Sequence, residues 1–175
     1  RPHNYLAISG GGPNGAFGAG LLVGWTATGT RPEFNMVTGV STGALTAPFV
    51  FLGPDYDEVM KKLYTTTTTE DIITKRNPIT AAFGDSMADT TPLKELLAKY
   101  VDADMIAAIA REHEKGRRLY IGTVNLDAGR SMIWSIGAIA ASDYPHKAEL
   151  IHELMRASAA IPIAFPPVVI PVEAG

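Results

Sequence analysis

The segment that most restricts the possible folds is residues 39–43, with the sequence Gly-Val-Ser-Thr-Gly. An apolar run at residues 35–40 predicts a strand, and residues 44–52 have a helical pattern. A strand, a sharp turn and a helix are the context in which G-x-S-x-G forms a nucleophile elbow, which holds the serine hydroxyl out beyond the end of the sheet. Gly39 and Gly43 would leave room for the turn, since a Cβ at either place would clash. The pattern is short and needs support from elsewhere in the chain.

A second glycine-rich turn follows the first predicted strand, residues 4–9. Residues 10–15 have the sequence Gly-Gly-Gly-Pro-Asn-Gly, and residues 16–28 predict a helix that Gly29 ends. That helix is apolar on most faces, so we expect it to be buried against a sheet. Three interpretations of the turn are open: a dinucleotide-binding G-x-G-x-x-G, an oxyanion hole, and a plain glycine turn that lets the helix pack closely.

The sequence context favours the oxyanion hole over the dinucleotide site. A dinucleotide site needs an acidic residue at the end of the second strand. Glu33 has roughly the right spacing but precedes that strand, which ends instead in Ser41. The backbone N–H groups of Gly10, Gly11 and Gly12, beside a helix N-terminus, could together face a developing negative charge. If the two strands are parallel neighbours, this turn and the elbow lie at the same sheet edge, where ligand sites form.

The rest of the chain alternates between predicted helices and strands. We expect helices over residues 55–64, 93–101, 104–115 and 146–160, and strands over residues 117–125 and 130–136 joined by a turn at 127–129. Pro48 is expected to kink the helix after the elbow. Residues 70–89 predict an irregular segment, and residues 161–172, with four prolines, predict an extended apolar one. The alternation indicates one α/β domain over residues 1–175, a sandwich with a mainly parallel sheet.

Composition excludes several classes of function. The 175 residues are 46% hydrophobic and 19% charged, which is typical of a globular domain. The net charge of −3, with no basic stripe, gives no basis for nucleic-acid binding. The chain has no cysteine, which excludes disulfides, thiol catalysis and cysteine-ligated zinc. No apolar run is long enough to form a transmembrane segment. The start at Arg1, without Met or a signal peptide, indicates a processed or trimmed product and leaves cytoplasmic and exported locations open.

Three blocks of the sequence resemble the patatin-like phospholipase family. They are residues 9–16 (SGGGPNGA), 39–44 (GVSTGA) and 157–168 (ASAAIPIAFPPV), in the order in which the family has them. The resemblance covers nearly the whole chain. It implies a three-layer α/β/α sandwich and hydrolysis of lipid acyl esters by a serine–aspartate dyad, without histidine. By position, Ser41 matches the nucleophile, and the glycines at 10–12 match the oxyanion loop.

The chain departs from the family in two places. Asn14 stands where the family usually has a basic residue. The aspartate of the dyad belongs to a D-G-G or D-G-A motif beyond the Phe-Pro-Pro-Val segment, and no such motif follows in the 175 residues. We therefore expect the chain to be the N-terminal portion of the domain, with the aspartate outside it. Asp127 in the predicted turn, and His146 or His152 on the last helix, are less favoured as the base, and His113 is expected on a solvated helix face.

The sequence thus predicts a lipid acyl hydrolase in which Ser41 attacks an ester carbonyl. The backbone N–H groups around Gly11, Gly12 and Thr42 would bind the oxyanion, and the apolar segment 161–172 and the segment 70–89 could line an acyl-chain pocket. We expect a lipid or ester substrate, encountered at a membrane surface, and no metal or organic cofactor. The alternative is a non-catalytic lipid- or protein-binding module on the same fold, with a nucleotide-binding domain less favoured.

Overall fold

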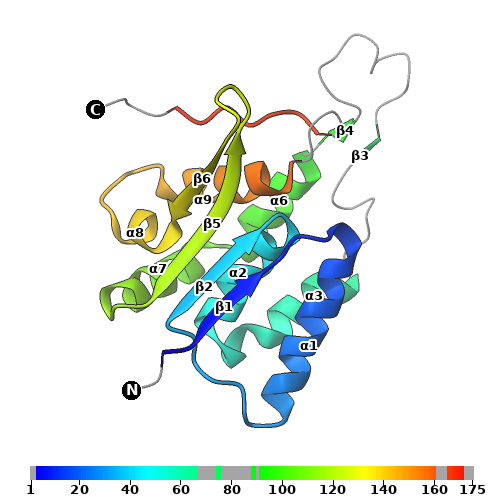
Figure 1. Cartoon of the computed structure of the whole chain (residues 1–175), viewed down its shortest axis with the longest axis vertical. Coiled ribbons are helices and arrows are strands. Elements are labelled where there is room, and N and C mark those ends of the chain that lie inside the picture. Colours follow the sequence, from blue (N-terminus) through cyan, green and yellow to red (C-terminus); the bar gives the residue numbers. More distant parts are fainter. Residues whose placement is uncertain (1–2, 67–73, 76–87, 90, 161–164, 172–175) are drawn as a thin grey trace.

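The computed structural model describes residues 3–66, 74–75, 88–89, 91–160 and 165–171. Its main sheet has the strand order β1-β2-β5-β6 (Figure 1). The strands are β1 (Tyr5–Ile8), β2 (Met36–Val40), β5 (Arg118–Asn125) and β6 (Arg130–Ser135). The helices are α1 (Gly15–Ala27), α2 (Thr42–Leu52), α3 (Asp57–Thr66), α6 (Thr91–Tyr100), α7 (Ala103–Glu114), α8 (Ile136–Ala141) and α9 (Lys147–Ala159). Short 3-10 turns η1 (Gly12–Asn14) and η2 (Pro54–Tyr56), and an antiparallel pair, β3 (Thr74–Lys75) and β4 (Ala88–Asp89), complete the described elements.

Two parallel pairings bring the predicted functional segments to one edge of the sheet. Strand β1 pairs with β2 so that Ile8 lies opposite Gly39, and β2 pairs with β5 so that Val40 lies opposite Gly122. Only β6 runs antiparallel, as the return strand of a hairpin with β5. The turns that follow β1 and β2 therefore leave the sheet at the same, carboxyl edge. The α/β class and the mainly parallel sheet are as predicted.

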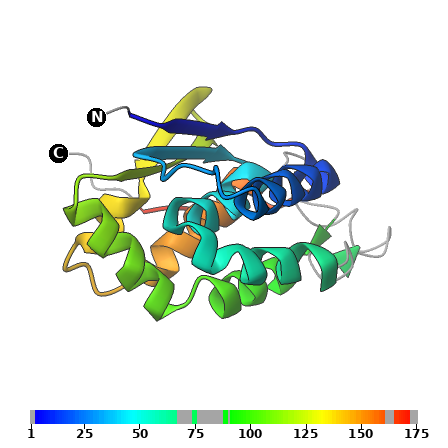
Figure 2. The same ribbon diagram turned by 90° about the horizontal axis from the view of Figure 1, so that it is seen from below.

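The helices lie on one face of this sheet in the described part of the chain (Figure 2). On that face Val37, Leu119 and Ile121 are fully buried. On the opposite face the side chains of Tyr5 and Ile133 are 65% and 75% exposed. The described residues thus form a sheet with one helical layer, and the second helical layer of the predicted sandwich stays a prediction.

Helix α1 is more exposed than its sequence predicts. Of its residues only Ala19 and Leu22 are buried, whereas Phe17 is 77% exposed and Leu21 is 61% exposed. The helix packs against α2 and α3 at the side of the layer, so it has one narrow contact face although most of its side chains are apolar. The expectation of a helix buried against the sheet was therefore wrong, because apolar composition alone does not say how many neighbours a helix has.

The other predicted elements occur with shifts of one to three residues at most of their ends. Helix α2 continues through Pro48, which is buried. The short helix α8 was not predicted, since its first residue was assigned to the preceding strand and it contains Gly137. Residues 161–164 and 172, and most of the segment 70–89, lie outside the described residues. The described part of the C-terminal segment, 165–171, contains neither helix nor strand.

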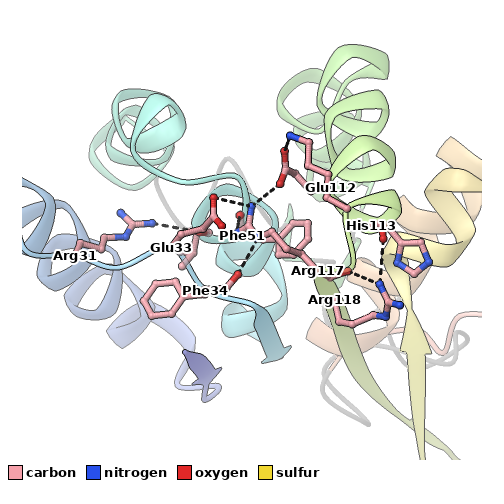
Figure 3. A network of polar contacts seen from close by, with 10 residues as sticks. Arg31, Glu33, Phe34, Phe51, Glu112, His113, Arg117 and Arg118 are labelled. Atoms are coloured by element: carbon pink, nitrogen blue, oxygen red, sulfur yellow. Dashed lines mark hydrogen bonds and ion pairs between the residues drawn. The ribbon is translucent and has the colours of Figure 1, made fainter. Parts of the chain in front are cut away.

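A buried arginine links several elements at the amino edge of the sheet, opposite the carboxyl edge at which the two glycine motifs lie (Figure 3). The Arg117 guanidinium donates to the Phe34 carbonyl at 2.8 Å, to the Phe51 carbonyl, and to the Glu112 carboxylate at 2.9 Å. It also lies 4.5 Å from the centre of the Phe51 ring, a cation–π contact. One side chain thereby joins the start of β2, the end of α2, the end of α7 and the start of β5.

The Glu112 carboxylate is part of the same network, and its pKa reflects its partners. Burial raises the pKa of this carboxyl, but hydrogen bonds from Lys115 and Arg117, together with their positive charges, outweigh burial. The net effect is a pKa below the usual value for glutamate. Glu112 therefore stays ionised in the folded protein at neutral pH.

Candidate active site

Ser41 occupies the sharp turn between β2 and α2. Its backbone has φ 57° and ψ −125°, and it is the single non-glycine residue with positive φ among those the structure describes. Such a conformation costs a residue with a side chain on the order of 1–3 kcal/mol and persists only where the surroundings enforce it. The predicted strand, sharp turn and helix are therefore present, with the strain located at the serine itself.

The two glycines of the motif allow α2 to start hard against the strands. A Cβ at Gly39 would lie 2.3 Å from the Gly43 carbonyl oxygen, and a Cβ at Gly43 would lie 2.3 Å from the Ile8 carbonyl oxygen. Both distances are far below van der Waals contact, and in both cases the obstacle is backbone, which has little freedom to move. The G-x-S-x-G spacing is thus required by the packing of the first turn of α2 on β1 and β2.

The glycine-rich turn after β1 meets the side chain of Ser41. A Cβ at Gly10 would lie 2.9 Å from the Ser41 Cβ and 3.5 Å from its hydroxyl oxygen. Gly11 then leads into η1, and Gly12 has φ +55°, a left-handed conformation that glycine adopts without strain. The structure therefore brings together the two glycine motifs, which are about thirty residues apart in the sequence.

Thr42, immediately after the serine, is the first residue of α2, so its backbone N–H has no acceptor within the helix. Its hydroxyl is buried and has no hydrogen-bond partner among the described residues. Beneath it, the Tyr64 hydroxyl lies 2.6 Å from the Thr46 hydroxyl. Burial raises the pKa of Tyr64, more than the hydrogen bond with Thr46 lowers it, so this phenol stays protonated. A Cβ at Gly15 would lie 3.0 Å from the Thr42 Cβ, so α1 also starts close to the elbow.

The backbone N–H of Ser41 is already engaged. It donates to the hydroxyl of Ser158, at the end of α9, over 2.8 Å. The Ser158 hydroxyl in turn donates to the Gly122 carbonyl on β5 over 2.6 Å. Sequence reasoning gave Ser158 no role, although it lies within the block 157–168. Its distance of 117 residues from Ser41 explains why spacing alone gave no signal.

The Ser41 hydroxyl has no hydrogen bond to a carboxylate or an imidazole in the part of the chain that the structure describes. Asp127 is exposed in the turn between β5 and β6, and the Nε2 of His152 lies 2.7 Å from the Val101 carbonyl. His146 faces Glu149 at the start of α9. Each of the three considered as a base thus has another environment in this structure.

His113 contradicts its predicted place on a solvated helix face. It is half-buried, its Nδ1 is fully buried without a partner among the described residues, and it packs so closely on α8 that a Cβ at Gly137 would lie 2.6 Å from Nδ1. Burial lowers the pKa of His113, and the nearby Arg118 lowers it further. The prediction was wrong because the four charged residues beside His113 in the sequence indicate a solvent-exposed helix face. The close contact of His113 with Gly137 in α8 involves a distant segment and cannot be predicted from the neighbouring residues.

The described residues hold no group of three or more His, Asp or Glu side chains that could bind a metal ion. Among the same residues, no helix combines the length and the apolar character needed to cross a membrane.

The fold and the site define a class of α/β protein in which a serine with a strained backbone, in a sharp turn between a strand and a helix, lies beside a glycine-rich turn at the carboxyl edge of the sheet. The family model described as patatin-like phospholipase matches residues 6–174. The chain therefore belongs to the patatin-like phospholipase family, whose members are in general lipid acyl hydrolases. No curated protein matches the chain at a significant level.

Proposed function

We propose that this chain carries the nucleophile and the oxyanion hole of a serine hydrolase that cleaves carboxylic esters of lipids, in the manner of a phospholipase A. The observation that carries the proposal is the strained backbone of Ser41, whose side chain lies against Gly10 at the carboxyl edge of the sheet. Backbone strain at a residue with a side chain is concentrated at functional sites. A serine in an ordinary turn would have no need of it.

In the proposed reaction the Ser41 oxygen attacks the ester carbonyl carbon while its proton passes to a base. The tetrahedral oxyanion accepts hydrogen bonds from the backbone N–H groups of the glycine turn, Gly10, Gly11 and Gly12, and from Thr42. Loss of one such donor typically slows catalysis about a hundred- to a thousandfold. The carbon–oxygen bond to the alcohol then breaks, the alcohol leaves with the proton, and water hydrolyses the acyl-enzyme to release the fatty acid and regenerate Ser41.

We further propose that the base is an aspartate outside these 175 residues. The proposal is supported by three of the least exposed carboxylates of the described residues, each of which forms an ion pair with an arginine. Asp57 pairs with Arg31, Glu112 pairs with Arg117, and Glu153 pairs with Arg156. In each pair the arginine donates hydrogen bonds to the carboxylate, and none of the three carboxylates is hydrogen-bonded to Ser41. None of these three is suited to activating a serine.

The lipid substrate would be met at a membrane surface, and α1 offers an apolar face for that contact. Residues 2–30 contain no Asp, Glu, Lys or Arg. Phe17 and Leu21, four residues apart and hence on one side of α1, are the most exposed large apolar side chains of this helix. The helix starts directly after the glycine turn, so its exposed face lies near the proposed ester site.

A fluorophosphonate probe tests the catalytic proposal on the full-length protein. The serine oxygen displaces fluoride from phosphorus, so labelling reports an activated nucleophile without requiring knowledge of the lipid. We expect one labelled site, lost in Ser41→Ala and kept in Ser131→Ala, a matched change at an exposed serine of β6. Labelling that survives Ser41→Ala would refute the assignment of the nucleophile.

The same experiment separates this proposal from the alternative of a non-catalytic binding module. That alternative has one observation in its favour, the absence of a base hydrogen-bonded to Ser41 among the described residues. A binding module would give no labelling at all while still binding lipid vesicles. Labelling at Ser41 together with release of fatty acid from phosphatidylcholine would exclude it.

A further inference from the structure

The hydroxyl of Ser158 joins three segments that are far apart in the sequence. It accepts a hydrogen bond from the Ser41 backbone N–H over 2.8 Å and donates one to the Gly122 carbonyl over 2.6 Å. A serine hydroxyl has one proton to donate, and the Gly122 carbonyl takes it. The rotation of the hydroxyl is therefore fixed, and its oxygen presents a lone pair to the elbow.

The support for this hydroxyl is rigid on both sides. Ser158 is the penultimate residue of α9, which is held in the core by the fully buried side chains of Ile151, Leu154 and Met155. On the other side, Gly122 is paired in register with Val40, the residue before the nucleophile. The position of α9 therefore constrains the backbone of the elbow directly, through the Ser158 hydroxyl.

The contact also decides which backbone N–H groups face the ester. A nucleophilic serine at positive φ could turn its own N–H toward the oxyanion or away from it. Here the N–H points at α9 and is satisfied there, whereas the N–H of Thr42, at the start of α2, has no acceptor within its helix. The Ser158 contact therefore removes the N–H of Ser41 from the oxyanion hole and leaves that of Thr42 available.

We propose that Ser158 is the positioning residue of this site: its hydroxyl holds Ser41 in the strained backbone conformation in which the nucleophile faces the glycine turn. The inference rests on the proposed function for its catalytic consequence, but the hydrogen bond itself can be tested without it. A strained conformation persists only while its surroundings enforce it, and this is the one side-chain hydrogen bond to the Ser41 backbone among the described residues.

The test compares Ser158→Ala and Ser158→Thr with a matched control, Ser142→Ala. Ser142 also donates from its hydroxyl to a carbonyl, that of Ile139 at 2.7 Å, but at the end of α8 and without contact with the elbow. The first readout is fluorophosphonate labelling of the full-length protein, separated into probe affinity and first-order rate. The second is hydrogen exchange of the Ser41 amide, which does not depend on catalysis.

We expect Ser158→Ala to slow the first-order labelling step about tenfold or more with little change in probe affinity, since it removes one hydrogen bond that orients the nucleophile. Exchange of the Ser41 amide should accelerate by a similar factor. Ser158→Thr, which keeps the hydroxyl, should restore both, and Ser142→Ala should alter neither. A merely structural role would lower thermal stability without this division between rate and affinity.

Wild-type rates of labelling in folded Ser158→Ala would overturn the inference, as would a Ser41 amide that exchanges freely in the wild-type protein. The latter measurement holds even if Ser158→Ala does not fold. If the wild-type protein is not labelled at all, the proposed function fails instead, and amide exchange alone then decides whether Ser158 holds the elbow.

Discussion

Substitution of Gly10 by alanine is the most direct test of the contact between the glycine turn and Ser41, the proposed nucleophile. The added Cβ would lie 2.9 Å from the Ser41 Cβ and 3.4 Å from the Val40 carbonyl oxygen. Carbon atoms in contact prefer about 3.5–4.0 Å, so the turn and Ser41 must separate by about 0.6 Å or more. Because Ser41 is held in a strained conformation, the movement is expected to displace its side chain from the proposed oxyanion hole.

The expected effect is mainly on reactivity. A displacement approaching 1 Å at a reacting group can cost on the order of a hundredfold in rate, so we expect first-order fluorophosphonate labelling to fall about ten- to a hundredfold in Gly10→Ala. Overpacking of this kind costs about 1–3 kcal/mol of stability, which thermal unfolding measures. The assay therefore has to be run well below the midpoint of unfolding, so that every variant is folded.

Gly20→Ala is the matched control. Gly20 is exposed in the middle of α1, and a Cβ there meets nothing within 4 Å. Alanine at such a position should stabilise the helix by about 0.5–1 kcal/mol and leave the labelling rate unchanged. If Gly10→Ala labels as fast as the wild type, the contact between the glycine turn and Ser41 does not govern the reactivity of the proposed nucleophile.

Two further predictions concern the surface of α1 and the response to acid. Phe17→Ser and Leu21→Ser should each weaken binding to phosphatidylcholine vesicles about tenfold or more in a sedimentation assay, since each removes a large apolar side chain. Ile133→Ser, on the exposed face of the sheet, should not weaken binding. Equal losses of binding in all three variants would refute a membrane role for α1. Both Glu112 and His113 have lowered pKa values in the folded protein, so in each case the unfolded chain takes up the proton first and stability falls with falling pH. His113 contributes to the stability above about pH 6.5, and this contribution should be lost as the pH falls below that value. Glu112 contributes above about pH 4.5, and its contribution should be lost below that value. In a series of urea titrations at different pH, His113→Gln should reduce the fall in unfolding free energy that begins at about pH 6.5.

Much of the fold follows from local patterns in the sequence. Strand β1, strand β2 and the hairpin of β5 and β6 each combine an apolar run with a glycine or a turn at its end, and in each case this signal lies in one continuous stretch of the sequence. The exposure of α1 was not predictable in the same way. Whether an apolar helix is covered depends on which other elements reach it, and the residues of α1 carry no information about that.

The residues of the candidate site also fall into those that local sequence patterns predict and those that depend on contacts with distant segments. Gly39, Gly43 and the turn at Gly10 were predicted from the sequence because glycine is needed where an added Cβ would lie within about 3 Å of neighbouring atoms, and a glycine is recognisable in the sequence itself. Ser158 was not assigned a role, because a serine near the end of a helix is ordinary and its meaning depends on two contacts with distant segments. Positions where the backbone requires glycine can therefore be predicted from the sequence. A side chain from a distant segment that stabilises a strained backbone can be identified only in the structure.

The stabilising network and the proposed site lie at opposite edges of the sheet, and this separation yields a last prediction. Arg117→Ala would leave the Phe34 and Phe51 carbonyls and the Glu112 carboxylate without their buried partner, a loss of about 3–5 kcal/mol that should lower the midpoint of thermal unfolding strongly. Because none of these contacts reaches the elbow, the labelling rate of the folded fraction should stay at the wild-type level. Ser158→Ala should do the reverse, with slow labelling and a modest loss of stability. If Arg117→Ala slows labelling in the folded protein as much as Ser158→Ala does, the conformation of Ser41 depends on the stability of the whole domain rather than on its own contacts at the elbow.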